Sequence, residues 1–338
     1  MINNRICILG TGAWATALGS RLSLNGNTVF LWGIDNNEVN DINSGYNKKY
    51  FGNTKFSSSL SATTDLKTAI GDSKYIIFAI PSTALDSVLD KVKEFLSDKK
   101  SQVILINVVK GIDAETSQIL SNKIKSKLGS HYYSRLVTLC GPSFATEVFE
   151  EKPTVINGTG KNLKIVKQVC ELFNSDVFKV IPINDIVGLQ VFSSLKNLLA
   201  IAVGLSQAEY TSVNTMSAIL TMGIEEIQKI ACKMKAKKWT IMSFCGIGDI
   251  FLTCSSTQSR NYSFGQDLLK KGVEKTIKEN KKTVEGFEVY KTAKNIITKY
   301  NINAPIFSSI IEVLEGKLDP KEFSKKCLEL FWNQKINK

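Results

Sequence analysis

RICILGTGAWATALGSRL, residues 5–22, contains the clearest structural motif in the sequence. It predicts a short apolar strand, a glycine turn and then a helix. Gly10 permits a tight turn, and Gly12 lets the backbone approach a pyrophosphate at the helix N-terminus. Ala15, at the third position of the motif, still allows close packing between helix and strand. This arrangement is typical of a dinucleotide-binding domain.

The alternation of strands and helices continues along the first half of the chain. Helical patterns at 85–96, 115–128 and 162–173 alternate with further apolar runs, at 28–32, 75–80, 103–109, 136–140, 154–158 and 178–182. Nearly continuous apolar strands that alternate with helices favour a parallel sheet with helices on both faces.

The pattern changes near residue 186, and every later periodic segment is helical. These segments are 187–208, 212–235, 283–300, 305–316 and a last helix that begins at DPKEF (319–323), with Asp319 as its N-cap. We therefore predict an α/β Rossmann-type N-terminal domain, residues 1–186, followed by an all-α C-terminal substrate domain, residues 187–338.

Composition limits the classes of protein that fit. The chain has 338 residues, of which 43% are hydrophobic and 22% charged, as in ordinary globular proteins. We expect no signal peptide. The apolar run around Lys196 has the length of a membrane span, but this lysine and its polar neighbours argue against stable membrane insertion. Seven cysteines without metal-type spacing indicate free thiols in a reducing cytoplasm and no metal site.

The net charge of +12 suits nucleic acid, an anionic membrane or a small anionic substrate. The densest run, KKGVEKTIKENKK (270–282), also carries Glu274 and Glu279, which favours a solvated surface. A nucleic-acid-binding protein is the non-enzyme alternative. It would need a clustered basic face with interleaved aromatic residues, and the sequence shows neither.

The residues after the second strand bear on the choice of coenzyme. Asp35 occupies the region where an acidic residue commonly binds the adenosine ribose. No arginine is nearby for a 2′-phosphate, which favours NAD(H) over NADP(H). Lys48 and Lys49 could still supply positive charge.

Polar residues follow two predicted strands and a later small-residue segment. Lys110 and Ser143 come just after strands, at the edge of a doubly wound sheet where ligands bind. Asp249 lies between glycines and an apolar run in GIGDIFLTC (246–254). Arg260, in SRN, offers the planar donor set that suits a phosphate.

Lys196 is the best candidate for proton transfer. A desolvated lysine can act as a general acid or base near neutral pH, and Asp249 could orient it and stabilise its charged form. The alternative is a lysine that only extends from a buried helix toward solvent. The single histidine, His131, is predicted to lie at the surface.

Several motifs together resemble the NAD(P)-dependent glycerol-3-phosphate dehydrogenases of bacterial type, over nearly the whole chain. They are GTGAWATAL (10–18), IPS (80–82), VKG (109–111), GPSFATE (141–147), LKN (195–197), GIGDIFLTC (246–254), SRN (259–261) and VEG (284–286). The glycine motif is shared by many dehydrogenases. LKN followed by GxGDxxLTC and SRN is far more specific.

The resemblance implies reversible reduction of dihydroxyacetone phosphate to sn-glycerol 3-phosphate by a nicotinamide coenzyme, in support of glycerophospholipid synthesis, and a homodimer. It implies that Lys196 is the acid or base, with Lys110 and Asp249 also catalytic. The implied substrate-binding residues are Lys110, Gly141, Ser143, Asn197, Thr253, Ser259, Arg260 and Asn261. The expected cofactor-binding residues are Gly10, Thr11, Gly12, Ala13, Trp14, Asp35, Tyr50, Pro81, Lys110, Ala145, Arg260, Val284 and Glu285.

The chain departs from the family pattern at several positions, among them FSS (192–194), which replaces the smaller residues often found before LKN. Ile34 stands where related sequences often carry a histidine or arginine, and Met216 and Met222 replace two usual basic residues. A second enzyme hypothesis therefore stays open. The 3-hydroxyacid and 6-phosphogluconate dehydrogenases share the two-domain plan and a catalytic lysine, and they would bind a carboxylate in place of the phosphate.

Overall fold

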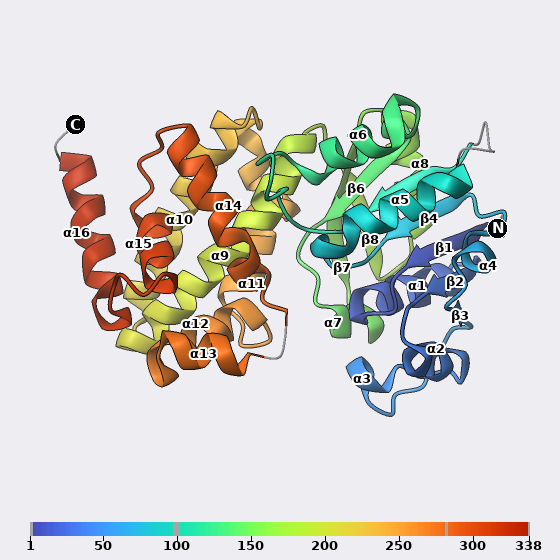
Figure 1. Ribbon diagram of the computed structural model, residues 1–338, viewed down its shortest axis with the longest axis horizontal. Coiled ribbons are helices and arrows are strands. Elements are labelled where there is room, and N and C mark those ends of the chain that lie inside the picture. Colours follow the sequence, from blue (N-terminus) through green and yellow to red (C-terminus); the bar gives the residue numbers. More distant parts are fainter. Residues whose placement is uncertain (1–2, 97–101, 281–282, 337–338) are drawn as a thin grey trace. The chain divides into compact units, whose positions relative to one another are not determined.

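An eight-stranded sheet is built from the first half of the chain (Figure 1). Its order is β3-β2-β1-β4-β5-β6-β7-β8. The strands are β1 (Arg5–Leu9), β2 (Thr28–Trp32), β3 (Ser61–Thr63), β4 (Tyr75–Phe78), β5 (Ile104–Asn107), β6 (Leu136–Cys140), β7 (Thr154–Gly160) and β8 (Phe178–Pro182). The chain passes from β1 to β2 on one side and later to β4 on the other. This reversal places the topological switch point of the sheet beside the glycine turn.

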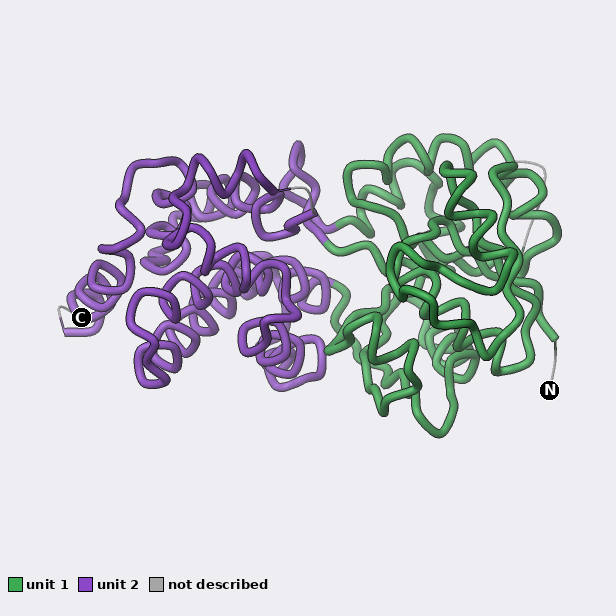
Figure 2. The backbone as a smooth tube through the Cα atoms, turned by 90° about the horizontal axis from the view of Figure 1, so that it is seen from below, with its two compact units in different colours: residues 1–110, 120–186 green, residues 111–119, 187–338 purple. Residues whose placement is uncertain are grey.

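The computed structural model describes residues 3–96, 102–280 and 283–336. It divides the chain into two compact units, which Figure 2 shows in different colours. Unit 1 comprises residues 1–110 and 120–186, and unit 2 comprises residues 111–119 and 187–338. Residues 111–119 belong to unit 2, although the residues on both sides of them in the sequence belong to unit 1.

The sheet is mixed, which corrects the expectation of a wholly parallel one. All neighbouring strands pair in parallel except β6 and β7, which are antiparallel. The helix between them, α7 (Ala145–Phe149), has five residues. Such a helix spans only about 8 Å, against roughly 17 Å for a five-residue strand. The helix does not span the length of a strand, and β7 begins at the edge of the sheet where β6 ends and runs antiparallel to it.

Helices cover both faces of the sheet, as predicted. Alternate residues of β1 point to opposite sides, so Ile6 and Ile8 belong to one apolar core and Cys7 and Leu9 to the other. The remaining helices of unit 1 are α1 (Ala13–Leu24), α2 (Asn36–Asn43), α3 (Lys48–Phe51), α4 (Leu66–Ile70), α5 (Leu85–Leu96), α6 (Leu120–Tyr133) and α8 (Leu163–Phe173).

The helix expected over 115–128 begins later, at Leu120. The preceding residues form a turn, in which Oδ1 of Asp113 accepts hydrogen bonds from the backbone N–H and the hydroxyl of Thr116. Ser117 then adopts a positive φ of 56°. Side-chain hydrogen bonds of this kind compete with helix formation.

The described residues of unit 2 from 187 onward form helices and no strand, as predicted. Its helices are α9 (Ile186–Tyr210), α10 (Val213–Lys233), α11 (Asp249–Cys254), α12 (Arg260–Lys271), α13 (Val273–Glu279), α14 (Glu285–Lys299), α15 (Pro305–Leu314) and α16 (Phe323–Ile336). The Asp319 side chain accepts a hydrogen bond from Lys321 N and caps a short turn before α16.

Helix α9 is nearly all buried and passes α12 at backbone contact. A Cβ at Gly204 would lie 2.1 Å from the Tyr262 carbonyl oxygen, and one at Gly265 would lie 2.1 Å from the Ile201 carbonyl oxygen. Only glycine fits at such a close approach. In the described residues α9 alone is long and apolar enough to cross a membrane, and 89% of that apolar window is buried within the structure.

Candidate functional site

The glycine turn has a backbone that only glycine tolerates. Gly10 has a φ of +130°, and a Cβ there would lie 2.3 Å from the Ala79 carbonyl oxygen. Its N–H donates to the Trp32 carbonyl at 2.8 Å, while Ala79 N donates to Leu9 O at 2.9 Å. The end of β1 is thereby fixed between its two neighbouring strands.

The N-terminus of α1 fits the pyrophosphate of a dinucleotide. Gly12 is the N-cap and supplies no side-chain acceptor, and no acidic residue lies in the first turn. The first N–H groups of a helix have no partner within the helix, and with the helix dipole they favour an anion. Ala13 and Trp14 form this first turn, and Trp14 also packs against the core of unit 1.

The structure gives Asp35 a capping role. It is the N-cap of α2, and its Oδ1 accepts the hydrogen bond of Asn37 N at 2.8 Å. Ile34, beside it, is 85% exposed.

A second carboxylate, Glu38, lies closer to the glycine turn and was not anticipated from the sequence. Its Oε2 accepts a hydrogen bond from the Thr11 hydroxyl at 2.5 Å, and its other oxygen pairs with Lys49. The available signal was the spacing of Asp35 and Glu38, which matches a capping box, but that signal predicts helix capping and no contact with the turn. Tyr50 lies on the same side of the turn, because its hydroxyl oxygen would be 4.0 Å from a Cβ at Gly12.

The other candidate residues of unit 1 follow the carboxyl ends of β4, β5 and β6. Pro81 is exposed at the start of a short turn after β4, and Lys110 is half-buried after β5. After β6, the Ser143 hydroxyl donates to the Gly141 carbonyl at 3.1 Å. A Cβ at Gly141 would lie 2.7 Å from Ile156 Cα, so this glycine permits close approach of the neighbouring strand. Ala145 begins α7.

In unit 2 the centre of the candidate site is a buried ion pair. Lys196 Nζ lies 2.7 Å from Asp249 Oδ1, with 4% and 1% of the two side chains exposed. Nζ also donates to Thr253 Oγ1 at 2.5 Å, and that hydroxyl donates to the Asp249 backbone carbonyl at 2.7 Å. Because its proton points to this carbonyl, the Thr253 oxygen presents its lone pairs to the ammonium group. Two acceptors from α11 therefore fix the end of the lysine.

The next residue of α9, Asn197, belongs to a separate amide network. Its Nδ2 donates to Glu285 Oε2 at 2.7 Å, and its Oδ1 accepts from Asn261 Nδ2 at 3.0 Å. Asn261 Oδ1 in turn accepts from Gly286 N at 2.8 Å. A Cβ at Gly286 would lie 2.5 Å from the Asn197 carbonyl oxygen. The network holds the start of α14 against α9 and α12.

The residues around Arg260 set the start of α12. Ser259 is buried, and its hydroxyl caps the helix by accepting from Tyr262 N at 3.3 Å. Arg260, the first helical residue, is exposed. Burial raises the pKa of Glu288 above its usual range, and the positive charge of Arg260 acts in the opposite direction. Val284 is buried as the N-cap of α14.

The two methionine positions differ in their surroundings. Met222 is 5% exposed in α10, so it packs in the core of unit 2, while Met216 is half-buried. His131 is exposed, as predicted.

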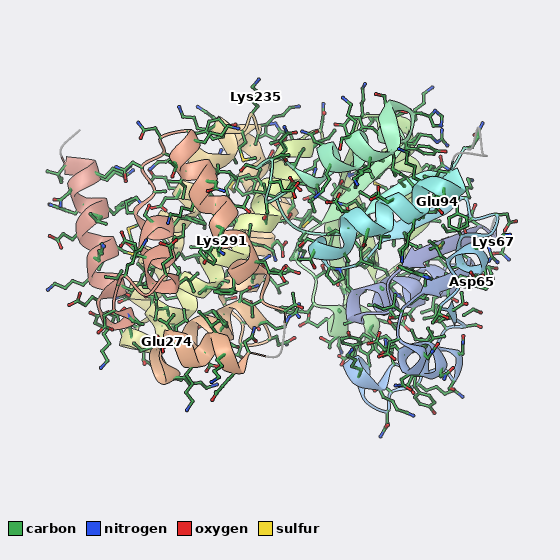
Figure 3. All side chains as sticks on the ribbon, in the orientation of Figure 1. Asp65, Lys67, Glu94, Lys235, Glu274 and Lys291 are labelled. Carbon is green, nitrogen blue, oxygen red and sulfur yellow. The ribbon has the colours of Figure 1, made fainter. Side chains whose placement is uncertain are left out.

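Charged side chains of both signs cover the surfaces of both units. The labelled residues of Figure 3, among them Asp65, Lys67, Lys235 and Glu274, are all exposed. Interspersed carboxylates of this kind do not favour the nucleic-acid alternative. All seven cysteines are free thiols.

Comparison with known proteins identifies the family. The family models for the N-terminal and C-terminal parts of NAD-dependent glycerol-3-phosphate dehydrogenase match residues 5–166 and 185–325. The chain belongs to this family. The "Glycerol-3-phosphate dehydrogenase [NAD(P)+]" of Mycoplasma mobile is 34% identical over 98% of this chain and 97% of its own length. The protein of the same name from Bacillus subtilis is also 34% identical, over 92% and 90%.

A solved structure of a family member has the same fold. The crystal structure of glycerol-3-phosphate dehydrogenase from Coxiella burnetii has a TM-score of 0.89 to this chain at 29% identity, covering 97% of this chain and 99% of its own. The predictions of an NAD(P)-dependent oxidoreductase, of its two-part fold and of a nicotinamide cofactor are confirmed at the level of the family. The hydroxyacid, phosphogluconate and nucleic-acid alternatives are not favoured.

Proposed function

We propose that this protein catalyses the reversible NAD(P)-dependent reduction of dihydroxyacetone phosphate to sn-glycerol 3-phosphate. The observation that carries this proposal is the buried Lys196–Asp249 pair in a chain of the glycerol-3-phosphate dehydrogenase family. An ammonium group is rarely buried unless it is paired, and such a pair is weak evidence for stability alone. A role in proton transfer accounts for its position.

In the proposed mechanism Lys196 is the general acid of the reduction. When bound, a reduced nicotinamide would supply the hydride that reaches the carbonyl carbon of the substrate. The Lys196 ammonium gives a proton to the carbonyl oxygen, which becomes the alcohol. In the oxidation, the neutral amine takes that proton back. Asp249 and Thr253 orient Nζ throughout, and Asp249 stabilises the charged form.

The substrate phosphate is proposed to bind Arg260. A guanidinium presents several donors in a fixed plane and stays charged at all relevant pH values. Ser259 would add a contact to the phosphate. Lys110, Gly141 and Ser143 are proposed to bind the substrate. Asn197 and Asn261 already use their amides within the protein, so we propose that they act by positioning α14 and the Val284–Glu285 segment.

The proposed cofactor site is centred on the glycine turn. Gly10, Gly12 and the first turn of α1 would hold the pyrophosphate through backbone N–H groups. Asp35 and Tyr50 would lie toward the adenosine end, and Pro81, Lys110 and Ala145 toward the nicotinamide end.

The cellular setting is likewise a proposal. We propose that residues 1–186 form the dinucleotide-binding domain and 187–338 the substrate domain, and that the protein is a cytoplasmic homodimer without stable membrane insertion. Its product would supply glycerophospholipid synthesis. Sedimentation at several protein concentrations and fractionation of the source cells test these points.

The test of the function is the loss of reduced-nicotinamide absorbance when dihydroxyacetone phosphate is added, with NADH and NADPH in parallel. We expect rapid loss with the phosphorylated ketone and little with a 3-ketoacid. Folded protein that binds the coenzyme but turns over only the ketoacid would overturn the proposed substrate.

A further inference from the structure

The short helix α3 is anchored to the glycine turn by the residue that precedes it. Asn47, which precedes α3, is fully buried and donates from Nδ2 to the Thr11 carbonyl at 2.9 Å and to Thr16 Oγ1 at 2.8 Å. At the other end of α3 the Phe51 ring stacks on Phe149 with centroids 4.0 Å apart. The residues between these anchors, including Lys49, are held beside the turn.

Glu38 of α2 joins the turn to Lys49. Only 11% of its side chain is exposed. One carboxylate oxygen accepts from the Thr11 hydroxyl and the other pairs with Lys49. The hydrogen bond with Glu38 raises the pKa of Lys49 above its usual range, so this lysine is charged and its charge is already opposed.

The other charges nearby are arranged in the same way. Lys48 Nζ lies 3.4 Å from Asp41 Oδ1, and Asp35 adds a third carboxylate at the end of β2. At the position between β2 and Asp35, Ile34 extends an uncharged side chain into solvent. The region after β2 therefore has three carboxylates and two lysines, and each lysine is paired with a carboxylate.

We propose that the Glu38–Lys49 pair makes this coenzyme site selective for NAD(H) over NADP(H). In this fold the adenosine ribose of a dinucleotide lies just beyond the end of β2. A ribose 2′-hydroxyl can donate to a carboxylate. A 2′-phosphate brings close to two negative charges, repels Asp35 and Glu38, and must separate Lys49 from Glu38 to gain a cation. This proposal rests on the proposed function in one respect, that the coenzyme is NAD(H) or NADP(H).

The test is equilibrium binding of NADH and NADPH to the full chain without substrate, followed by quenching of tryptophan fluorescence or by calorimetry. For the wild type we expect NADH to bind at least about tenfold more tightly. In Glu38→Gln the amide oxygen can still accept from Thr11, but the carboxylate is lost and Lys49 is released. The ratio of the two dissociation constants should then shift toward NADPH by about tenfold.

Two further variants make this result specific. Glu38→Gln combined with Lys49→Ala should lose the gain in NADPH affinity, because the released cation is absent. Asp41→Asn is the matched control. It releases Lys48, which is next to Lys49 on α3, and it leaves the hydrogen bond between Glu38 and Thr11 unchanged. This variant should change the ratio little. Thermal melts of each variant establish that it is folded.

Three results would overturn the proposal: tighter binding of NADPH by the wild type, an unchanged ratio in Glu38→Gln, or an equal shift in Asp41→Asn. Turnover of dihydroxyacetone phosphate tests the proposed function separately. Selective NADH binding without turnover of dihydroxyacetone phosphate would contradict the function and leave the selectivity standing, and binding of neither coenzyme would contradict both.

Discussion

Lys196 on α9 and Asp249 on α11 are 53 residues apart in the sequence, yet their charged atoms lie 2.7 Å apart in the interior of unit 2. Neither group could be buried alone without a large desolvation cost. The pair therefore couples the proposed chemistry to the stability of the helical unit.

Lys196→Met should abolish turnover and also lower stability. A general acid or base contributes about 10²–10⁴-fold to the rate, and removing one partner of a buried pair costs about 3–5 kcal/mol. Steady-state rates and denaturant unfolding measure the two effects. The double variant Lys196→Met with Asp249→Asn should regain much of the stability and none of the activity. Recovery of turnover in the double variant would remove Lys196 from its role.

Arg260→Ala should raise the KM for dihydroxyacetone phosphate by about tenfold or more, with a smaller change for unphosphorylated dihydroxyacetone. The reason is that a charge-assisted hydrogen bond is worth roughly 1.5–3 kcal/mol. Initial rates over a range of both substrates give the comparison. Lys270→Ala, which removes an exposed charge from the last turn of the same helix, is the matched control. Equal losses with the two ketones would contradict phosphate recognition by Arg260.

Glu226 should make the stability of the protein depend on pH. It is fully buried in α10 and accepts hydrogen bonds from Ile306 N and Phe307 N, and burial raises its pKa to about 8. Between the usual glutamate pKa and about 8, the folded state binds a proton that the unfolded state lacks. The free energy of unfolding therefore falls as pH rises through this window, by up to about 1.4 kcal/mol per pH unit from this group.

Glu226→Gln is the comparison for that effect. Its amide oxygen can still accept at the start of α15, but it does not titrate. Unfolding measured from pH 5 to pH 9 should show a flatter dependence in the variant than in the wild type. Parallel curves would mean that Glu226 keeps the same proton occupancy in the folded and unfolded states.

Gly204→Ala should destabilise unit 2, because its new Cβ would meet the Tyr262 carbonyl oxygen at 2.1 Å. Overpacking of this kind costs about 1–3 kcal/mol, which a thermal melt would detect. Ser206→Ala in the same helix is a useful control. Its buried hydroxyl has no hydrogen-bond partner among the described residues, so its removal should be close to neutral. A Gly204→Ala protein as stable as the wild type would show that α9 and α12 can separate at little cost.

Much of the fold could be predicted from local patterns. The glycine turn and the first strand and helix follow from residues 5–22, because the backbone freedom of Gly10 and the missing side chain of Gly12 are properties of those residues themselves. The reversed direction of β7 could not be predicted from apolar runs. It depends on how far α7 can carry the chain, and apolar periodicity does not measure that distance.

The candidate site divides in the same way. An isolated lysine in an apolar helix demands a partner, so a link between Lys196 and Asp249 could be proposed in advance. The contact of Glu38 with Thr11 could not, because it arises only when α2 folds back on the turn. The resemblance implied that Asn261 binds the substrate, whereas its contact with Gly286 N became visible only in the structure. Sequence indicates which groups need partners and rarely which partner each group takes.

Lys196 and Asn197 are consecutive residues of one buried helix, yet the first is bound to α11 and the second to α12 and α14. A rotation of α9 about its own axis would move both side chains together. Lys196, the proposed proton-transferring residue, and the segment at Val284 are thus linked through a single peptide bond. Any ligand that tightens the Val284 segment would also restrain the lysine.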